Sequence, residues 1–155
     1  MNKSEIIKKV ASAFHEKWKE NRLQSDGKYR PMIEKSRDEK RTKEHWTDLV
    51  DIANTEFESL PSNWKYENFE AAKLAVNLVY DKVANWVDVS SEMIEKMSKV
   101  VHEKWLERNW IDWSFENQRV DYKKLSEEEK DKDRMQIKLA INVIELENNH
   151  TENYV

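Results

Sequence analysis

The chain has 155 residues, 27 of them basic and 31 acidic, and a formal net charge of −4. Charges of both signs are spread along the chain, so they form no basic stripe of the kind that holds a nucleic acid backbone. The sequence contains no Cys, which excludes disulfides, thiolate zinc sites and cysteine nucleophiles. It also has no apolar run of the roughly 18 residues that cross a membrane, and no secretion signal at its start. We therefore expect a cytoplasmic protein with neither a nucleic acid nor a membrane as partner.

The first predicted helix occurs twice in the chain. Residues 4–20 (SEIIKKVASAFHEKWKE) return 87 positions later as residues 91–107 (SEMIEKMSKVVHEKWLE), with nine of seventeen positions identical. In both copies apolar residues recur at the three-and-four spacing of one helical face, which ends in Trp18 and Trp105. We therefore expect a tandem duplication, with both Trp side chains in the core.

The segments that follow these helices differ between the two copies. Trp18 and Leu60 are 42 residues apart, whereas the matching Trp105 and Leu125 are 20 apart, so the first repeat carries 22 extra residues. From Leu60 and Leu125 onward the copies realign with an offset of 65. Each then continues into an aliphatic helix that is apolar on much of its circumference. We expect these two aliphatic helices at the centre, with the first pair of helices outside them.

The insertion in the first repeat holds the only Gly of the chain, Gly27. Asp-Gly predicts a turn there, and Pro31 favours an extended piece at Tyr29 and Arg30. The charged run at 37–45 is predicted to be a loop with partial helix. In the second repeat, alternating apolar residues in 109–122 predict a short strand or extended arm. Two such pieces, one from each repeat, could pair.

Short polar residues before the predicted helices are the expected N-caps. These residues are Ser4, Ser36 with Glu39, Ser90 or Ser91, and Ser126 with Glu129.

Together these patterns predict a mainly α fold built of two repeats related by a pseudo-two-fold axis. Each repeat has two main helices and a short extended arm. The expected organisation is a single domain, residues 1–155, with repeat 1 at about 4–84, repeat 2 at about 90–147 and a polar tail at 148–155.

A pattern of His-x-x-Trp on an apolar helix, then Tyr-x-x-Leu, then a Glu/Lys run ending in Asp-Arg covers most of residues 91–146. Its members are His102, Trp105, Tyr122, Leu125, Glu128, Lys130, Asp133 and Arg134. The pattern resembles the ryanodine-receptor repeat. The first half is similar more loosely, through His15, Trp18, Tyr29, Phe57 and Leu60. The second copy departs from the family in lacking the Gly-bearing turn and the Pro stretch after its first helix.

The resemblance implies a function, because free-standing bacterial and phage versions of this repeat have been proposed as receptors for nucleotide-derived signals in antiviral conflict. It implies a non-enzymatic binder of an immune second messenger, such as a cyclic ADP-ribose isomer or a cyclic oligonucleotide. The protein would act as a sensor or, in a phage, as a sponge in the host cytoplasm. The absence of a fused effector domain favours the sponge.

Motifs for catalysis are missing. His-Glu at 15 and 102 is similar to the start of a zinc-protease helix, but Lys19 and Leu106 stand where the second His would be. One Gly in total excludes a GxGxxG loop, a P-loop and a GxSxG elbow. We expect no enzyme, no metal and no cofactor.

Aromatic and Arg residues in the variable segments are the candidate binding groups, because a purine stacks on an aromatic face and a guanidinium fork matches phosphate oxygens. His15 and His102 lie at the edge of the apolar faces, where each ring can pack while one nitrogen reaches a loop backbone, or can contact a ligand. The predicted ligand-binding residues are Tyr29, Arg30, His15, His102, Trp110 and Arg119.

Two alternatives stay open. The same aromatic surface, which also includes Trp46 and Trp113, suits a protein–protein interface, or most of these side chains merely plug loops onto the core. The oligomeric state is open as well, with a homo-oligomer as one option.

Overall fold

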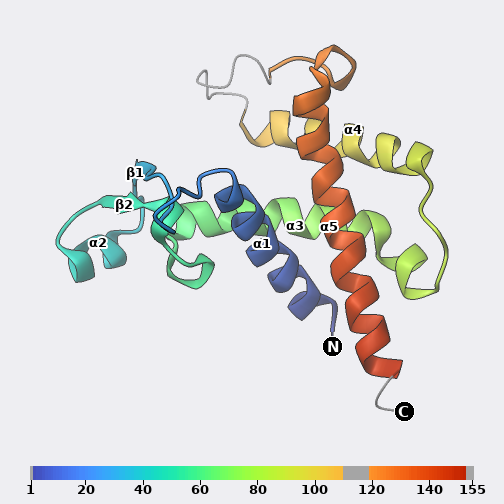
Figure 1. Ribbon diagram of the computed structural model, residues 1–155, viewed down its shortest axis with the longest axis horizontal. Helices are drawn as coiled ribbons and strands as arrows, with labels where there is room; N and C mark the ends of the chain where they lie inside the picture. The colour runs from blue at the N-terminus through green and yellow to red at the C-terminus, as the bar shows by residue number, and fades with distance from the viewer. Residues whose placement is uncertain (1, 110–118, 153–155) are drawn as a thin grey trace. The chain divides into compact units, whose positions relative to one another are not determined.

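The computed structural model describes residues 2–109 and 119–152, and this part of the chain is mainly helical, as predicted (Figure 1). None of its helices is both long and apolar enough to span a membrane. The helices are α1 (Lys3–Glu20), α2 (Glu39–His45), α3 (Ser62–Ala84), α4 (Ser91–Arg108) and α5 (Glu127–Glu152). The strands are β1 (Ile33–Lys35) and β2 (Leu49–Asp51).

The chain divides into two compact units. The first unit holds the residues up to Val10 together with those from Ala71 onward, and the second unit holds Ala11–Glu70. Both boundaries fall inside helices, α1 and α3, rather than at the predicted junction of the repeats. The single domain and the pseudo-two-fold axis stay predictions.

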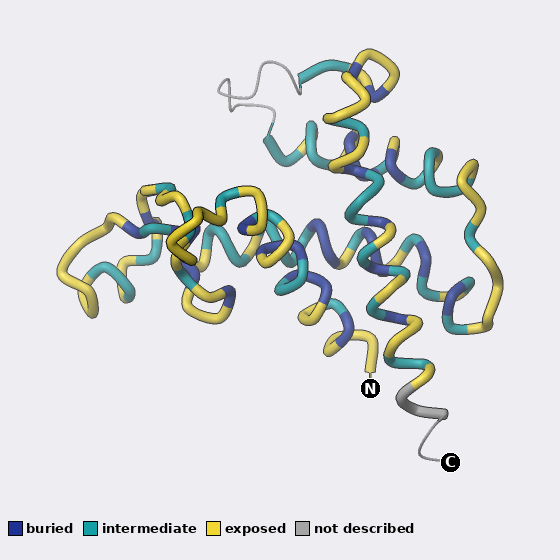
Figure 2. The backbone as a smooth tube through the Cα atoms, in the orientation of Figure 1, coloured by how far each residue is buried: buried dark blue, intermediate teal, exposed yellow. Residues whose placement is uncertain are grey.

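In the first unit α5 crosses and packs on α4 (Figure 1). The buried apolar residues of α5 recur at intervals of three and four, at Ile137, Ala140 and Ile144, which places them on one face of the helix. Figure 2 shows buried, intermediate and exposed stretches alternating along this helix. Two polar contacts bring the other helical segments of this unit to the end of α5. Lys9 Nζ of α1 lies 2.5 Å from Glu147 Oε1, and Asn148 Nδ2 donates to the carbonyl oxygen of Val83 in α3, at 3.1 Å.

In the second unit β1 and β2 form an antiparallel hairpin with Glu34 opposite Val50. Both strands belong to the first repeat, and the predicted pairing of one arm from each repeat stays a prediction. The expected arm of the second repeat, 109–122, lies mostly outside the described residues. Val50 buries its side chain, whereas its neighbour Leu49 is exposed and Asp51 is half-buried, as expected of a strand with one covered face.

Helix ends were predicted with mixed success. Ser90 caps α4 and Ser126 caps α5, each by accepting a backbone N–H three residues on, at 3.2 Å, as predicted. The predicted caps Ser4 and Ser36 are wrong. Asn2 Oδ1 accepts from the amide of Glu5 instead, at 2.9 Å, and Asp38 Oδ1 accepts from the amide of Arg41, at 3.1 Å. Asn and Asp satisfy the same orphan amides as Ser does, so spacing alone does not choose among them.

The two repeated Trp side chains are half-buried rather than core residues, which corrects the prediction. In α1 the buried face runs through Ile6, Val10 and Phe14 and includes His15. It is rotated away from Trp18, which stacks on the imidazole of His15 at 5.9 Å between ring centroids. Periodicity defines such a face only to within one position on each side.

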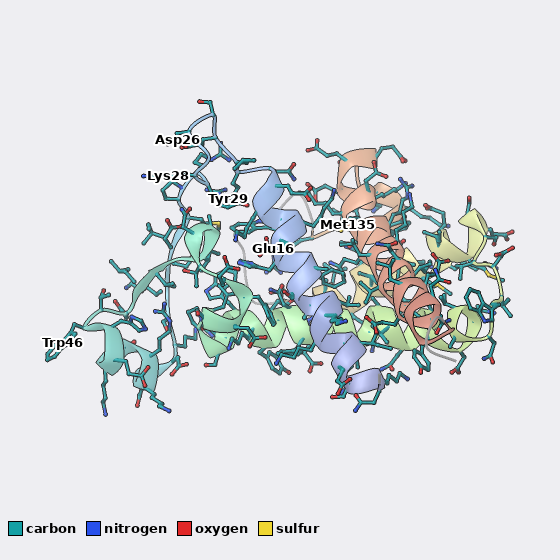
Figure 3. All side chains as sticks on the ribbon, turned by 60° about the horizontal axis from the view of Figure 1, so that its bottom comes forward. Glu16, Asp26, Lys28, Tyr29, Trp46 and Met135 are labelled. Atoms are coloured by element: carbon teal, nitrogen blue, oxygen red, sulfur yellow. The ribbon has the colours of Figure 1, made fainter. Side chains whose placement is uncertain are left out.

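Two helices end in a tryptophan with a left-handed backbone. Trp46 follows α2 with φ 59°, and Trp86 follows α3 with φ 60°. After α3 the amide of Val87 donates to Lys82 O and that of Trp86 donates to Val83 O, at 2.8 and 3.1 Å, which is the usual pattern of a helix end that favours Gly. Trp46 is 94% exposed and projects from the end of α2 (Figure 3).

We expect Trp46→Gly to stabilise the protein, although it removes a large side chain. A left-handed conformation costs a residue other than Gly about 1–2 kcal/mol, and the extra entropy of an unfolded Gly takes back about 0.5–1 kcal/mol. Because Trp46 is exposed, little packing is lost. Urea unfolding should show a gain of roughly 0.5–1 kcal/mol. The control Lys43→Gly, inside α2, should cost about 1 kcal/mol. A destabilised Trp46→Gly would show that the indole is packed after all.

The Asp51 carboxylate stabilises the hairpin by accepting three hydrogen bonds. Asp51 Oδ1 accepts from the amides of Met32 and Ala53, at 3.0 and 3.2 Å, and Oδ2 accepts from Asn54 Nδ2, at 2.7 Å. Burial alone would raise the pKa of Asp51, but these hydrogen bonds outweigh it and lower the pKa. The stability they give is present above the unfolded-state pKa of about 3.9 and is lost as pH falls through the lower folded-state pKa.

Asp51→Ala should therefore cost about 1–3 kcal/mol at pH 7, and the gap to the wild type should close in acid. Urea unfolding at pH 7 and at the acid end measures both effects. Asp48→Ala removes an exposed carboxylate from the same hairpin and should leave stability nearly unchanged. If the difference in unfolding free energy between wild type and Asp51→Ala did not change with pH, the ionised carboxylate would not be the group that stabilises the hairpin.

Candidate functional site

Both repeated histidines are buried and tie their helix to a loop backbone. His15 Nε2 lies 2.7 Å from the carbonyl oxygen of Thr55, and His102 Nε2 lies 2.5 Å from that of Val120. A carbonyl only accepts, so Nε2 carries the proton in each ring. The prediction that one nitrogen reaches a loop backbone is confirmed. In each half the accepting residue stands two positions before a 3₁₀ turn, Phe57–Ser59 or Tyr122–Lys124.

The second nitrogen of His102 faces a buried carboxyl group. Its Nδ1 lies 3.6 Å from Asp133 Oδ2, and both residues are buried. Burial, followed by the charge of Glu129, raises the pKa of Asp133 to about 7. Nε2 is engaged by Val120 O, so Nδ1 is the ring nitrogen that faces this carboxyl group. The position that matches Asp133 in the first repeat is Asn68, which does not titrate.

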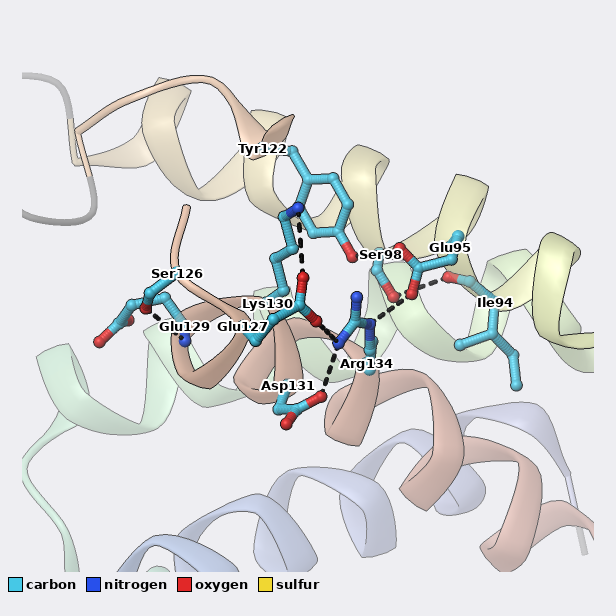
Figure 4. A network of polar contacts seen from close by, with 10 residues as sticks. All are labelled: Ile94, Glu95, Ser98, Tyr122, Ser126, Glu127, Glu129, Lys130, Asp131 and Arg134. Atoms are coloured by element: carbon cyan, nitrogen blue, oxygen red, sulfur yellow. Dashed lines mark hydrogen bonds and ion pairs between the residues drawn. The ribbon is translucent and has the colours of Figure 1, made fainter. Parts of the chain in front are cut away.

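A charged network joins α4 to α5 beside this histidine (Figure 4). Arg134 of α5 donates through Nε to Glu95 of α4, and through Nη1 to Glu127 and Asp131, at 2.9 and 2.7 Å. The Tyr122 hydroxyl donates to Glu95 Oε2 at 2.9 Å. The hydrogen bond from Arg134 is the main reason why the pKa of Glu95 is lowered, whereas burial and the bond to Glu95 raise the pKa of Tyr122 to about 12.

The matching positions of the first repeat make an apolar contact instead. Phe57 stands where Tyr122 stands in the second repeat, and Phe69 stands where Arg134 stands. Their rings meet edge to face at 5.5 Å between centroids. The helix-to-turn junction is therefore held by aromatic packing in one half and by charge in the other.

Cations lie over aromatic rings at the end of α1. Lys19 is 3% exposed, and its ammonium group lies 4.7 Å from the centroid of the Tyr29 ring and 3.4 Å from Glu16 Oε1. The Arg22 guanidinium lies 5.4 Å from the Trp18 ring. Lysine is rarely buried without a partner. The Tyr29 ring therefore serves as a cation–π partner of the buried Lys19 ammonium group.

The turn predicted at Asp26-Gly27 is present after α1, and Tyr29 and Arg30 follow it. Gly27 has φ 83°, and the Asp26 carboxylate accepts from the amide of Lys28 at 2.9 Å (Figure 3). The Asn54 amide clamps the backbone of Tyr29 from both sides, through Tyr29 N at 3.3 Å and Tyr29 O at 3.0 Å. The backbone of Arg30 is held by a second pair of hydrogen bonds, to Arg22.

Arg22 and Arg30 are joined through the main chain. The amide of Arg30 donates to Arg22 O at 2.6 Å, and Arg22 Nε donates to Arg30 O at 2.8 Å. The side chain of Arg30 is exposed and, within the described part of the chain, makes no hydrogen bond or ion pair. A fixed backbone thus presents a free guanidinium to solvent.

The six predicted ligand-binding residues are distributed over both units. His15, Tyr29 and Arg30 belong to the second unit, where Thr55 and Asn54, neighbours in sequence, hold His15 and Tyr29. His102 and Arg119 belong to the first unit, and Arg119 Nη2 donates to Asn109 O at 2.5 Å. The remaining residue, Trp110, lies outside the described residues. Both histidines are buried and already bonded, so the structure gives them a structural task, and their ligand role stays a prediction.

Sequence reasoning missed Lys19 and Arg22, the two cations beneath the turn. The signal was available, because in the second copy Leu106 and Asn109 stand at these positions. Both positions change from a cation to a neutral residue between the copies, and both lie next to the segment that carries the insertion. Such a change indicates where the two copies differ in function.

Among the described residues, no group of three or more His, Asp or Glu side chains is arranged to hold a metal ion. No protein-family model, curated protein or solved structure matches the chain.

The buried carboxyl group of Asp133 yields a stability prediction. Because its folded-state pKa is raised above the unfolded value of about 3.9, its contribution is fully present below that value and is lost as pH rises through about 7. Asp133→Asn, the residue of the first repeat, should remove this dependence.

Urea unfolding at pH 4.5 and pH 8 is the measurement. From pH 4.5 to pH 8 the wild type should lose stability relative to Asp133→Asn on the order of 2–4 kcal/mol. Asp121→Asn, an exposed carboxylate nearby, should follow the wild type. Parallel wild-type and Asp133→Asn curves would mean that Asp133 is ionised in the folded protein throughout.

Proposed function

We propose that the protein binds an anionic, nucleotide-derived second messenger at the end of α1 and the turn after it, and releases it unchanged. The observation that carries the proposal is the aromatic and cationic cluster of the second unit. Tyr29 and Arg30 have clamped backbones, and Lys19 lies over one face of the Tyr29 ring. An adenine base would stack on the other face, and Arg30 would pair with a phosphate.

Preorganisation supports this assignment. The Asn54 clamp and the Arg22 clamp hold the turn in one conformation before any ligand arrives, which lowers the ordering cost of binding. Lys19 and Arg22 are already engaged with rings and carbonyl groups, so they position the turn and add positive potential, whereas Arg30 is the group that contacts the ligand.

The repeat architecture belongs to the same proposal. The bond from His15 to Thr55 and that from His102 to Val120 join positions that match under the offsets of 87 and 65. This repetition supports two tandem repeats of the ryanodine-receptor type related by a pseudo-two-fold axis. From that resemblance we take the ligand class, a cyclic ADP-ribose isomer or a cyclic oligonucleotide, and a role as sensor or phage sponge in the cytoplasm.

A second candidate function is a protein-interaction module, and one observation favours it. Trp46 is 94% exposed and held in a left-handed conformation. Exposed Trp side chains are frequent anchors of protein interfaces. Trp46 lies outside the turn that carries Tyr29 and Arg30, so mutations at Trp46 and at Arg30 can test the two functions separately.

Calorimetry against cyclic ADP-ribose isomers and cyclic di- and trinucleotides tests the first proposal. Arg30→Ala should weaken binding about 10- to 100-fold, the worth of one hydrogen bond to a charged group. Its melting temperature should stay unchanged because Arg30 is exposed. Lys28→Ala removes a neighbouring cation of the same turn and is the matched control, with binding within about threefold of wild type.

The bound compound is recovered after each titration and identified. An intact compound is the expected result. Heat with none of the compounds would favour the interaction module, and a cleaved product would make the protein an enzyme.

A further inference from the structure

The outer edge of β1 is an open strand edge. The amide of Ser36 donates to Asp48 O, and that of Ile52 donates to Met32 O, at 2.6 and 3.0 Å. In an antiparallel ladder the directly bonded pairs alternate with unbonded ones. The residues between these bonds, Ile33 and Lys35, therefore turn their N–H and C=O groups away from β2.

The outer edge of β2 is partly closed by contrast. Thr47 Oγ1 accepts from the amide of Leu49 at 3.1 Å, and the hydroxyl of Thr55 donates to Asp51 O at 2.7 Å. Within the described residues, the outward groups of Ile33 and Lys35 have no such partner. A two-stranded ribbon is marginal by itself, and adding a third strand stabilises it.

We infer that β1 binds an extended peptide segment of a protein partner, which adds to the hairpin as a third, antiparallel strand. Such addition uses main-chain hydrogen bonds for affinity and alternate side chains for specificity. The four outward groups of Ile33 and Lys35 supply the main-chain part. This surface is separate from the residues proposed to bind the nucleotide-derived ligand.

The side chains of β1 define the chemistry of the incoming strand. Ile33 is 56% exposed and shares its face with Leu49, 49% exposed, across the hairpin. Opposite Ile33 an apolar residue fits, opposite Lys35 an acidic one, and opposite Glu34, on the other face, a basic one. Read in the antiparallel direction, the partner segment is acidic, then basic, then apolar.

A second copy of the chain is a poorer occupant. Antiparallel pairing of β1 with itself in the central register would place Glu34 directly opposite Glu34 of the second copy. Like charges directly opposite each other are destabilising. The charge pattern therefore favours a foreign strand with a basic residue at that position.

Amide hydrogen exchange on the free protein tests the premise. Glu34 should be protected, while Ile33 and Lys35 should exchange near the rate of an unfolded chain. Protection of Ile33 and Lys35 in the free protein would overturn the inference, since the edge would then be occupied.

The probe for binding is the capped peptide Ser-Thr-Val-Glu-Lys-Val-Thr-Ser, followed by NMR. The amide signals of residues 33–35 should shift saturably, and exchange at Ile33 and Lys35 should slow about tenfold at a peptide concentration ten times the Kd. Ile33→Pro removes an outward donor that β2 does not use, so it should abolish binding, whereas Ile33→Val should retain it.

A charge exchange keeps the test decisive if Ile33→Pro unfolds the hairpin. Glu34→Lys should weaken binding of the original peptide about two- to thirtyfold, and a peptide with Glu in place of its Lys should bind Glu34→Lys better than it binds the wild type. Absence of saturable shifts, or equal binding of both peptides to both proteins, would overturn the inference. Dimerisation of the protein through the same signals would overturn it too, in favour of a second copy.

Discussion

A buried imidazole needs an acceptor for its N–H, and in both halves of this chain a loop carbonyl provides it. The bond from His15 to Thr55 spans 40 residues and that from His102 to Val120 spans 18, a difference equal to the 22-residue insertion. Loop-closure entropy grows only with the logarithm of length, so the longer loop costs about 0.7 kcal/mol more. The first repeat could therefore acquire the turn, α2 and the hairpin without losing the tie between helix and 3₁₀ turn.

The insertion concentrates the groups that distinguish the halves. Tyr29 and Arg30 exist only there, and Lys19 and Arg22 beneath them are replaced by Leu106 and Asn109 in the second copy. In the second half, Arg134 instead forms ion pairs within the protein, with Glu95, Glu127 and Asp131. The first half thus exposes Arg30 above the buried Lys19, while the second half uses Arg134 between its own helices.

The parts that followed from the sequence are those set by strong local rules. The paired helices, the turn at Gly27 and the histidine bonds come from periodicity, from the need for a positive φ, and from the cost of an unpaired buried N–H. No local rule of comparable strength predicts the strands, the Trp at the end of α2 or the candidate site. Strands of three residues are too short to show alternation, and a Trp at the left-handed position of Trp46 contradicts the preference for Gly there. The candidate site needed the structure because Lys19 meets Tyr29 only after the turn folds back.

The exchange of Phe57 and Phe69 for Tyr122 and Arg134 has a consequence for the response to salt. Partly exposed ion pairs are screened over about 8 Å at physiological ionic strength, and over about 3 Å at 1 M. Apolar contacts are unaffected or strengthened by excluded salts. Rising ionic strength therefore weakens the charged contacts of Arg134 between α4 and α5, whereas the aromatic contact of Phe57 with Phe69 is maintained, so the two junctions differ in their response to salt.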